Sequence, residues 1–223
     1  MTVSTKYPYI TCKFTKRKPE EMQERASEYY NLMDERRTVR EFSPEPIPEG
    51  VLENCIRAAS TAPSGAHKQP WHFCVVRDPK IKHAIRLAAE KEEKENYDHR
   101  FPEDWLRDLE IFGTDENKEY LDIAPALVVI FRENYRMVEG KRIKNYYVNE
   151  SAGIAAGMFI AALHNSGLAS LTHTPNPMAF LNQILERPKN EVPILLMPVG
   201  YPKEGTQIPD LNRKPLGEVM TEY

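Results

Sequence analysis

Residues 36–40 read Arg36-Arg37-Thr38-Val39-Arg40, directly after a segment with helical periodicity. The run places three guanidinium groups and one hydroxyl within five residues. Because the planar fork of an arginine makes two parallel charge-assisted hydrogen bonds to an oxyanion, the three side chains could converge on one phosphate. The alternative is a solvated basic helix end, which would complement the helix dipole after Asp34 and Glu35.

Farther along the chain, the proline, glycine and alanine content of residues 61–70 predicts a loop. Its segment Ala62-Pro63-Ser64-Gly65-Ala66 could offer backbone N–H groups and a hydroxyl to a flat or anionic ligand, because small residues let the backbone approach closely. A plain turn is the alternative. The chain has neither GxxxxGK[ST] nor GxGxxG, which disfavours a Walker loop and leaves a Rossmann dinucleotide site without support.

Two further groups of residues could carry chemistry. Thr172-His173-Thr174 follows a short predicted strand, and strand ends often carry functional side chains. Glu93 and Tyr97 are four residues apart, hence on one helical face, and together with Lys118 they could hold an amino-acid zwitterion. The alternatives are a structural histidine at position 173 and a solvated charged helix over the other three residues.

The periodicity of apolar residues sets out the elements around these motifs. It predicts helices over 19–36, 48–59, 79–95, 147–165 and 178–185, and strands over 71–76, 126–131, 169–172 and 194–199. Residues 102–118 show no clear period, and their possible half-buried anchors are Trp105, Leu106, Leu109, Ile111 and Phe112. The uneven alternation of helices and strands predicts one α+β or α/β domain over 19–223, after an N-terminal extension over 1–18.

The composition is that of a globular protein. The chain has 223 residues, a net charge of −3 and 41% hydrophobic residues, which excludes disorder over most of its length and gives no basic footprint for nucleic acid. Cys12, Cys55 and Cys74 lie far apart, so we expect free thiols in a reducing compartment, and the scattered histidines predict no metal site. The chain has no apolar run of membrane-spanning length and no signal-like N-terminus, so we expect a soluble, cytoplasmic protein.

Taken together, the runs at 36–40, 61–67 and 70–71 resemble the nitroreductase superfamily of FMN proteins. The acidic segment 90–97, with Lys118 beyond it, is similar to the deiodinase branch of that superfamily. The remaining matching stretches lie at 119–122, 172–175, 198–202 and 209–216. The resemblance implies an α+β fold, in which helices flank a central mixed sheet, and a domain-swapped homodimer whose two interfacial sites each bind one FMN. It also implies a lid over about residues 90–120 and a C-terminal arm over about residues 203–223.

The resemblance also implies roles for individual residues. The residues that would bind FMN are Arg36, Arg37, Thr38, Arg40, Pro63, Ser64, Gly65, Thr172, His173, Thr174 and Arg213. The hydroxyl of Thr174 would approach flavin N5, and the backbone N–H of Ala66 would meet the substrate phenolate. Glu93, Tyr97 and Lys118 would bind the substrate zwitterion and close the lid. His173 departs from the vertebrate pattern, which has a threonine there, and the change is compatible with flavin binding if its backbone faces the flavin.

The activity implied by the resemblance is FMN-dependent reductive dehalogenation of 3-halotyrosines (iodo-, bromo- or chlorotyrosine) to tyrosine and halide. The reductant would be NAD(P)H or a flavin- or ferredoxin-type donor. The vertebrate membrane anchor has no counterpart in this sequence, so a soluble form is expected. Two alternatives remain: a general FMN-dependent NAD(P)H nitro- or quinone reductase, and a non-catalytic protein that binds flavin or halotyrosine. The predicted zwitterion site favours the dehalogenase.

Overall fold

The computed structural model describes residues 8–223, and the chain divides into two compact units, one ending at Glu35 and the other beginning at Arg36. In the N-terminal unit, helix α1 (Pro19–Asp34) begins with a proline in its first turn, as the sequence predicts, and buries none of its side chains. The predicted extension over 1–18 lies partly outside the described residues. The larger unit, Arg36–Tyr223, contains every other helix and strand that the structure describes.

A four-stranded sheet forms the centre of the larger unit. Its order is β1 (Trp71–Val76), β2 (Ala126–Glu133), β6 (Glu191–Gly200) and β5 (Ala169–Ser170). These strands pair antiparallel throughout, and a parallel bridge joins Thr38 to Ser170. The parallel part of the predicted mixed sheet therefore consists of this bridge, which brings the arginine run to the edge of the sheet.

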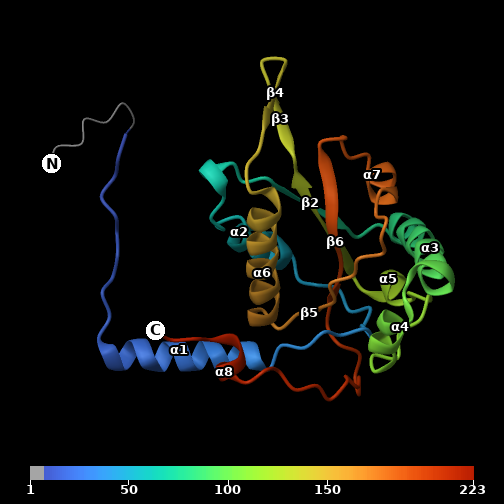
Figure 1. Ribbon diagram of the computed structural model, residues 1–223, viewed down its shortest axis with the longest axis horizontal. Coiled ribbons are helices and arrows are strands. Elements are labelled where there is room, and N and C mark those ends of the chain that lie inside the picture. Colours follow the sequence, from blue (N-terminus) through green and yellow to red (C-terminus); the bar gives the residue numbers. More distant parts are fainter. Residues whose placement is uncertain (1–7) are drawn as a thin grey trace. The chain divides into compact units, whose positions relative to one another are not determined.

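Both faces of the sheet are covered by helices (Figure 1). Helices α2 (Val51–Ala59) and α6 (Val148–Asn165) cover one face, and α3 (Pro79–Glu95), α5 (Tyr120–Ile123) and α7 (Phe180–Ile184) cover the other. Strand β2 is buried from residue 126 to residue 131, and alternate residues of this run belong to the cores on opposite faces. This arrangement explains why the run reads as continuously apolar rather than alternating.

The sequence pattern does not predict several short elements of the structure. The hairpin of β3 (Tyr135–Val138) and β4 (Lys141–Lys144) is largely exposed, so it shows no apolar alternation. Its turn places Glu139 and Gly140 at positive φ, a geometry that matches the twist of a two-residue hairpin. The other short elements are the helical turns η1 (Gly65–His67) and η2 (Asn96–Arg100) and the helices α4 (Glu103–Glu110) and α8 (Leu216–Val219).

Over residues 8–223, no helix combines the length and the apolarity that a membrane span requires.

Candidate functional site

A cavity of about 300 Å³ lies against the end of α3, the following segment η2–α4 and residues 171–174. It brings together side chains from three of the motifs that the sequence singles out. These side chains are Arg40, Glu93, Tyr97, Lys118, Thr172, His173 and Thr174. The predicted zwitterion site and the predicted flavin-facing strand therefore share one cavity.

A buried ion pair lines this cavity. The Lys118 ammonium lies 3.6 Å from the Glu93 carboxylate, and the two side chains are only 3% and 8% exposed. The same ammonium donates to Thr114 Oγ1 and to the Asp115 carbonyl, and it lies 5.5 Å from the centre of the Tyr97 ring. Burial lowers the pKa of Lys118, and the Glu93 carboxylate opposes that shift. Two opposite charges that face one cavity match a ligand that carries an ammonium and a carboxylate.

The side chain of His173 belongs to this charged group. Its Nε2 lies 3.4 Å from Glu93 Oε1, and its ring meets the Tyr120 ring edge-on at 6.0 Å. Its backbone N–H donates to the carbonyl of Leu196, whose N–H donates back to the His173 carbonyl. The N–H of His173 is therefore already paired within the sheet.

The buried imidazole predicts a pH dependence of stability. Burial lowers the pKa of His173 below 6.5, and Lys118 and Arg40 add to this effect while Glu93 opposes it. The unfolded chain therefore binds a proton near pH 6.5 that the folded chain rejects, so stability falls as pH drops below that value. We expect wild type to lose more stability than His173→Gln between pH 7 and about pH 5.5, as measured by urea denaturation.

The exposed His72 provides a control for this measurement. His72→Gln should follow the wild-type pH dependence, because it leaves the buried His173 ring in place. Parallel curves for wild type and His173→Gln would contradict the expected exclusion of a proton from the buried ring.

The arginine run lines two further cavities of about 190 and 220 Å³. Arg213 donates 2.8 Å to the carbonyl of Arg36, and Arg37 donates to the carbonyl of Pro209, which brings the C-terminal arm to this run. Burial lowers the pKa of Arg36, and the neighbouring charges of Arg213 and Arg37 lower it further. Within the described part of the chain, no carboxylate forms an ion pair with Arg36, Arg37 or Arg40. Their donors fit a phosphate monoester.

The loop that contains Ser64 has an unusual backbone. Ala66, His67 and Gln69 all have positive φ, which costs a non-glycine residue about 1 kcal/mol or more. The N–H groups of residues 65, 67, 68 and 69 are all hydrogen-bonded, whereas that of Ala66 has no partner among the described residues. A strained turn that leaves one N–H group unpaired is suited to hold an anion or a carbonyl oxygen.

This loop does not line the three cavities described above. It lies instead at the N-terminal end of α6, where the N–H of Gly65 donates 3.3 Å to Ser151 Oγ. A Cβ at position 65 would lie 2.9 Å from the Tyr146 carbonyl oxygen, so only glycine fits there. The predicted site residues therefore fall into two groups in one chain: Pro63, Ser64, Gly65 and Ala66 in this loop, and the remainder around the three cavities.

The sequence singles out Tyr97, Trp105 and Leu109 individually, but it does not predict that aromatic side chains form a wall of the cavity that contains Glu93 and Lys118. Phe101 stacks on Trp105 with ring centres 4.5 Å apart, and Tyr97 meets Phe101 edge-on at 5.5 Å. The spacing of four residues between these rings was the available signal, but the Pro102 that interrupts the helix obscures it. Leu109, Asn96 and Tyr120 also line this cavity. Two predicted anchors are largely exposed: Trp105 at 52% and Ile111 at 60%.

Comparisons with known proteins agree with this geometry. Residues 33–201 match the Nitroreductase family. The chain is 57% identical over 217 residues to iodotyrosine deiodinase of Haliscomenobacter hydrossis, an alignment that covers 97% of this chain and 96% of the relative. It is 46% identical to iodotyrosine deiodinase 1 of Homo sapiens, over 90% of this chain and 70% of that relative. A crystal structure of oxidised iodotyrosine deiodinase bound to FMN and 3-iodo-L-tyrosine superposes with a TM-score of 0.73 at 30% identity, covering 84% of this chain and 97% of that chain.

Proposed function

The chain belongs to the nitroreductase family, and on that basis we propose that it is an FMN-dependent oxidoreductase that removes halogen from 3-halotyrosines. The products would be tyrosine and halide. The observation that carries the proposal is the buried pair of Glu93 and Lys118, which lines the cavity of about 300 Å³ beside Thr172 and Thr174. A nitroaromatic or a quinone has no ammonium and carboxylate to match this pair, whereas an amino acid has both.

The residues around the cavities fit FMN. Arg36, Arg37, Arg40 and Arg213 would hold its phosphate, and Thr38 would add a hydroxyl. The unneutralised charge of the arginine run supports this assignment, because clustered cations are stabilised by a bound anion. When bound and reduced by the electron donor, FMN would supply the two electrons that the reaction requires.

The chain's own groups would select and position the substrate. The unpaired N–H of Ala66 would hold the substrate phenolate, and a halogen ortho to the hydroxyl favours that anion because it lowers the phenol pKa. Glu93 would accept from the substrate ammonium, and Lys118 would donate to its carboxylate. Phe101 and Trp105 would exclude water from the cavity, and the Thr174 hydroxyl would donate toward flavin N5.

The division of the site residues supports a homodimer in which each site contains groups from both subunits. One chain separates the Ser64 loop from the arginine and zwitterion groups, so a second copy would complete each site. Helix α6 offers a surface for this association, since Gly153 and Gly157 have open space around them and Ile154 is 46% exposed. Small residues on an exposed helix face allow another helix to approach closely.

We propose that the dimer is domain-swapped. We also propose that the electron donor, NAD(P)H or a flavin- or ferredoxin-type protein, reduces the flavin through the same cavity. The cytoplasmic location stays a prediction from the sequence.

Anaerobic turnover tests the proposed activity. The purified protein is incubated with FMN, dithionite and 3-iodotyrosine, and tyrosine and iodide are quantified. We expect many turnovers per flavin. Rapid reduction of nitroaromatics without iodide release would favour a general nitro- or quinone reductase, and bound FMN without turnover of either acceptor would favour a binding protein.

A further inference from the structure

Lys118 is fixed at its backbone as well as at its ammonium, and a different residue of α3 makes each contact. Its backbone N–H donates 2.7 Å to Glu90 Oε1, and its side chain lies 3.6 Å from Glu93. The two glutamates are three residues apart and therefore share a helix face. This face of α3 holds one lysine at two points, although Lys118 follows Glu90 by 28 residues.

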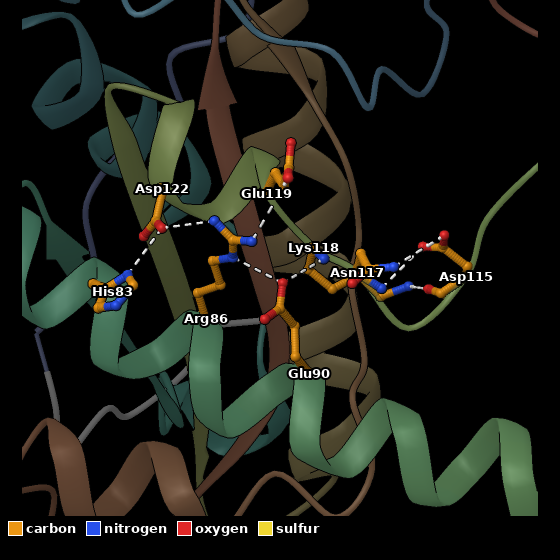
Figure 2. Close-up of polar contacts among 8 residues, drawn as sticks. All are labelled: His83, Arg86, Glu90, Asp115, Asn117, Lys118, Glu119 and Asp122. Carbon is orange, nitrogen blue, oxygen red and sulfur yellow. Dashed lines mark hydrogen bonds and ion pairs between the residues drawn. The ribbon is translucent and has the colours of Figure 1, made fainter.

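Glu90 is itself held in place by Arg86, one turn earlier on α3 (Figure 2). Arg86 Nε donates 2.7 Å to Glu90 Oε1, the same oxygen that accepts from the Lys118 N–H. Arg86 NH1 donates 2.9 Å to Asp122 Oδ2, which also lies 3.0 Å from His83 Nδ1. The Arg86 and Glu90 side chains are only 22% and 20% exposed, so this network is shielded from much of the solvent.

From this arrangement we infer that Glu90 is a positioning residue for the substrate carboxylate: its hydrogen bond to the backbone of Lys118 sets where the ammonium meets the ligand. The inference rests on the proposed function, because it takes the zwitterion of a halotyrosine as the ligand of Lys118. Glu90 lines none of the three cavities described above, so it would act only through Lys118.

Two substitutions separate the hydrogen bond that Glu90 accepts from the Lys118 N–H from the ion pair that Glu90 makes with Arg86. Glu90→Gln keeps an acceptor oxygen for the Lys118 N–H but loses the charge that pairs with Arg86. Glu90→Asp keeps the charge but withdraws the carboxylate by about 1.5 Å, so it no longer reaches the N–H. Glu119→Ala is the matched control, since Glu119 is 73% exposed, approaches Arg86 only to 3.9 Å and adjoins Lys118 in the sequence.

The experiment measures dissociation constants of the FMN-loaded proteins by titrating the flavin signal. For 3-iodotyrosine we expect Glu90→Asp to weaken binding about tenfold, and Glu90→Gln and Glu119→Ala to stay within about threefold of wild type. For 3-iodotyramine, which lacks the carboxylate, we expect all four proteins to bind alike. KM for 3-iodotyrosine should rise in Glu90→Asp while kcat stays near its wild-type value, because the contact positions a group remote from the ring.

Each remaining outcome is decisive. Equal weakening by Glu90→Gln and Glu90→Asp would overturn the inference, because it would assign the effect to the Arg86 ion pair. The inference would also be overturned if Glu90→Asp left the affinity for 3-iodotyrosine unchanged, or if it weakened the affinities for 3-iodotyramine and 3-iodotyrosine equally. If wild type itself neither binds nor dehalogenates 3-iodotyrosine, the proposed function fails, whereas an active wild type with an unaffected Glu90→Asp refutes only the role of Glu90.

Discussion

Lys118→Ala should weaken the binding of 3-iodotyrosine about 100-fold or more while leaving the affinity for FMN within about twofold. The lysine ammonium is 3% exposed and lies 3.6 Å from Glu93, so its removal leaves a buried carboxylate without its partner and a substrate carboxylate without its cation. FMN should be unaffected, since the proposed phosphate ligands come from the arginine run. Titration of the flavin absorbance with 3-iodotyrosine measures the first affinity, and flavin retention during dialysis measures the second.

Glu93→Gln should also weaken halotyrosine binding strongly, because a neutral amide meets the substrate ammonium less favourably than a carboxylate. In the double variant with Lys118→Ala, the loss of binding free energy for 3-iodotyrosine should be smaller than the sum of the two single losses, because both residues bind one ligand. Lys94→Ala is the matched control: its side chain is 66% exposed, and among residues 8–223 its ion-pair partner is Asp98, at 3.9 Å. Equal affinities for 3-iodotyrosine in Lys118→Ala, Lys94→Ala and wild type would remove the basis of the proposed zwitterion site.

Mixed dimers should recover activity that neither parent has. Lys118→Ala inactivates the zwitterion group, and Gly65→Val inactivates the Ser64 loop, since a Cβ there would lie 2.9 Å from a backbone oxygen. If each site takes one group from each subunit, a dimer of the two variants has one doubly altered site and one intact site. Random reassociation makes half of the dimers mixed, so we expect about a quarter of wild-type activity.

Differently tagged subunits, co-expressed and purified through both tags, should approach half of wild-type activity per dimer. Circular dichroism of the Gly65→Val parent verifies that the loop change leaves the fold intact. A mixed dimer as inactive as its parents would show that each chain builds its site alone, and it would refute the shared site.

The parts of the fold that the sequence predicts well are those in which burial repeats along the chain. Strand β2 illustrates this point, because a run buried on both faces is apolar at every position. The exposed hairpin of β3 and β4 shows no such pattern, and its turn depends on Glu139 at a positive φ that glutamate rarely adopts. Helix α5 has four residues, which is too short for any helical period to emerge.

The candidate site shows a similar limit. Residue type and spacing single out the groups around Arg36, Ser64, Glu93 and Thr172 as candidates, and the family resemblance implies their roles. Spacing does not reveal that one chain keeps the Ser64 loop apart from the other groups, because that separation depends on how helices cover the sheet. Nor does it reveal that Glu90 holds a backbone N–H, since a backbone group leaves no mark in the sequence.

Anion binding and docking of the C-terminal arm use the same side chains. Arg37 donates to the carbonyl of Pro209, and Arg213 donates to the carbonyl of Arg36. The guanidinium groups that would bind a phosphate also hold the C-terminal arm. A coupling free energy therefore links anion binding to docking of the arm. Thermodynamic linkage makes this coupling reciprocal: docking of the arm raises the affinity for the anion, and loss of the anion weakens docking of the arm. The susceptibility of residues near Pro209 to a protease would therefore report how much of the protein holds its cofactor, without any measurement of catalysis.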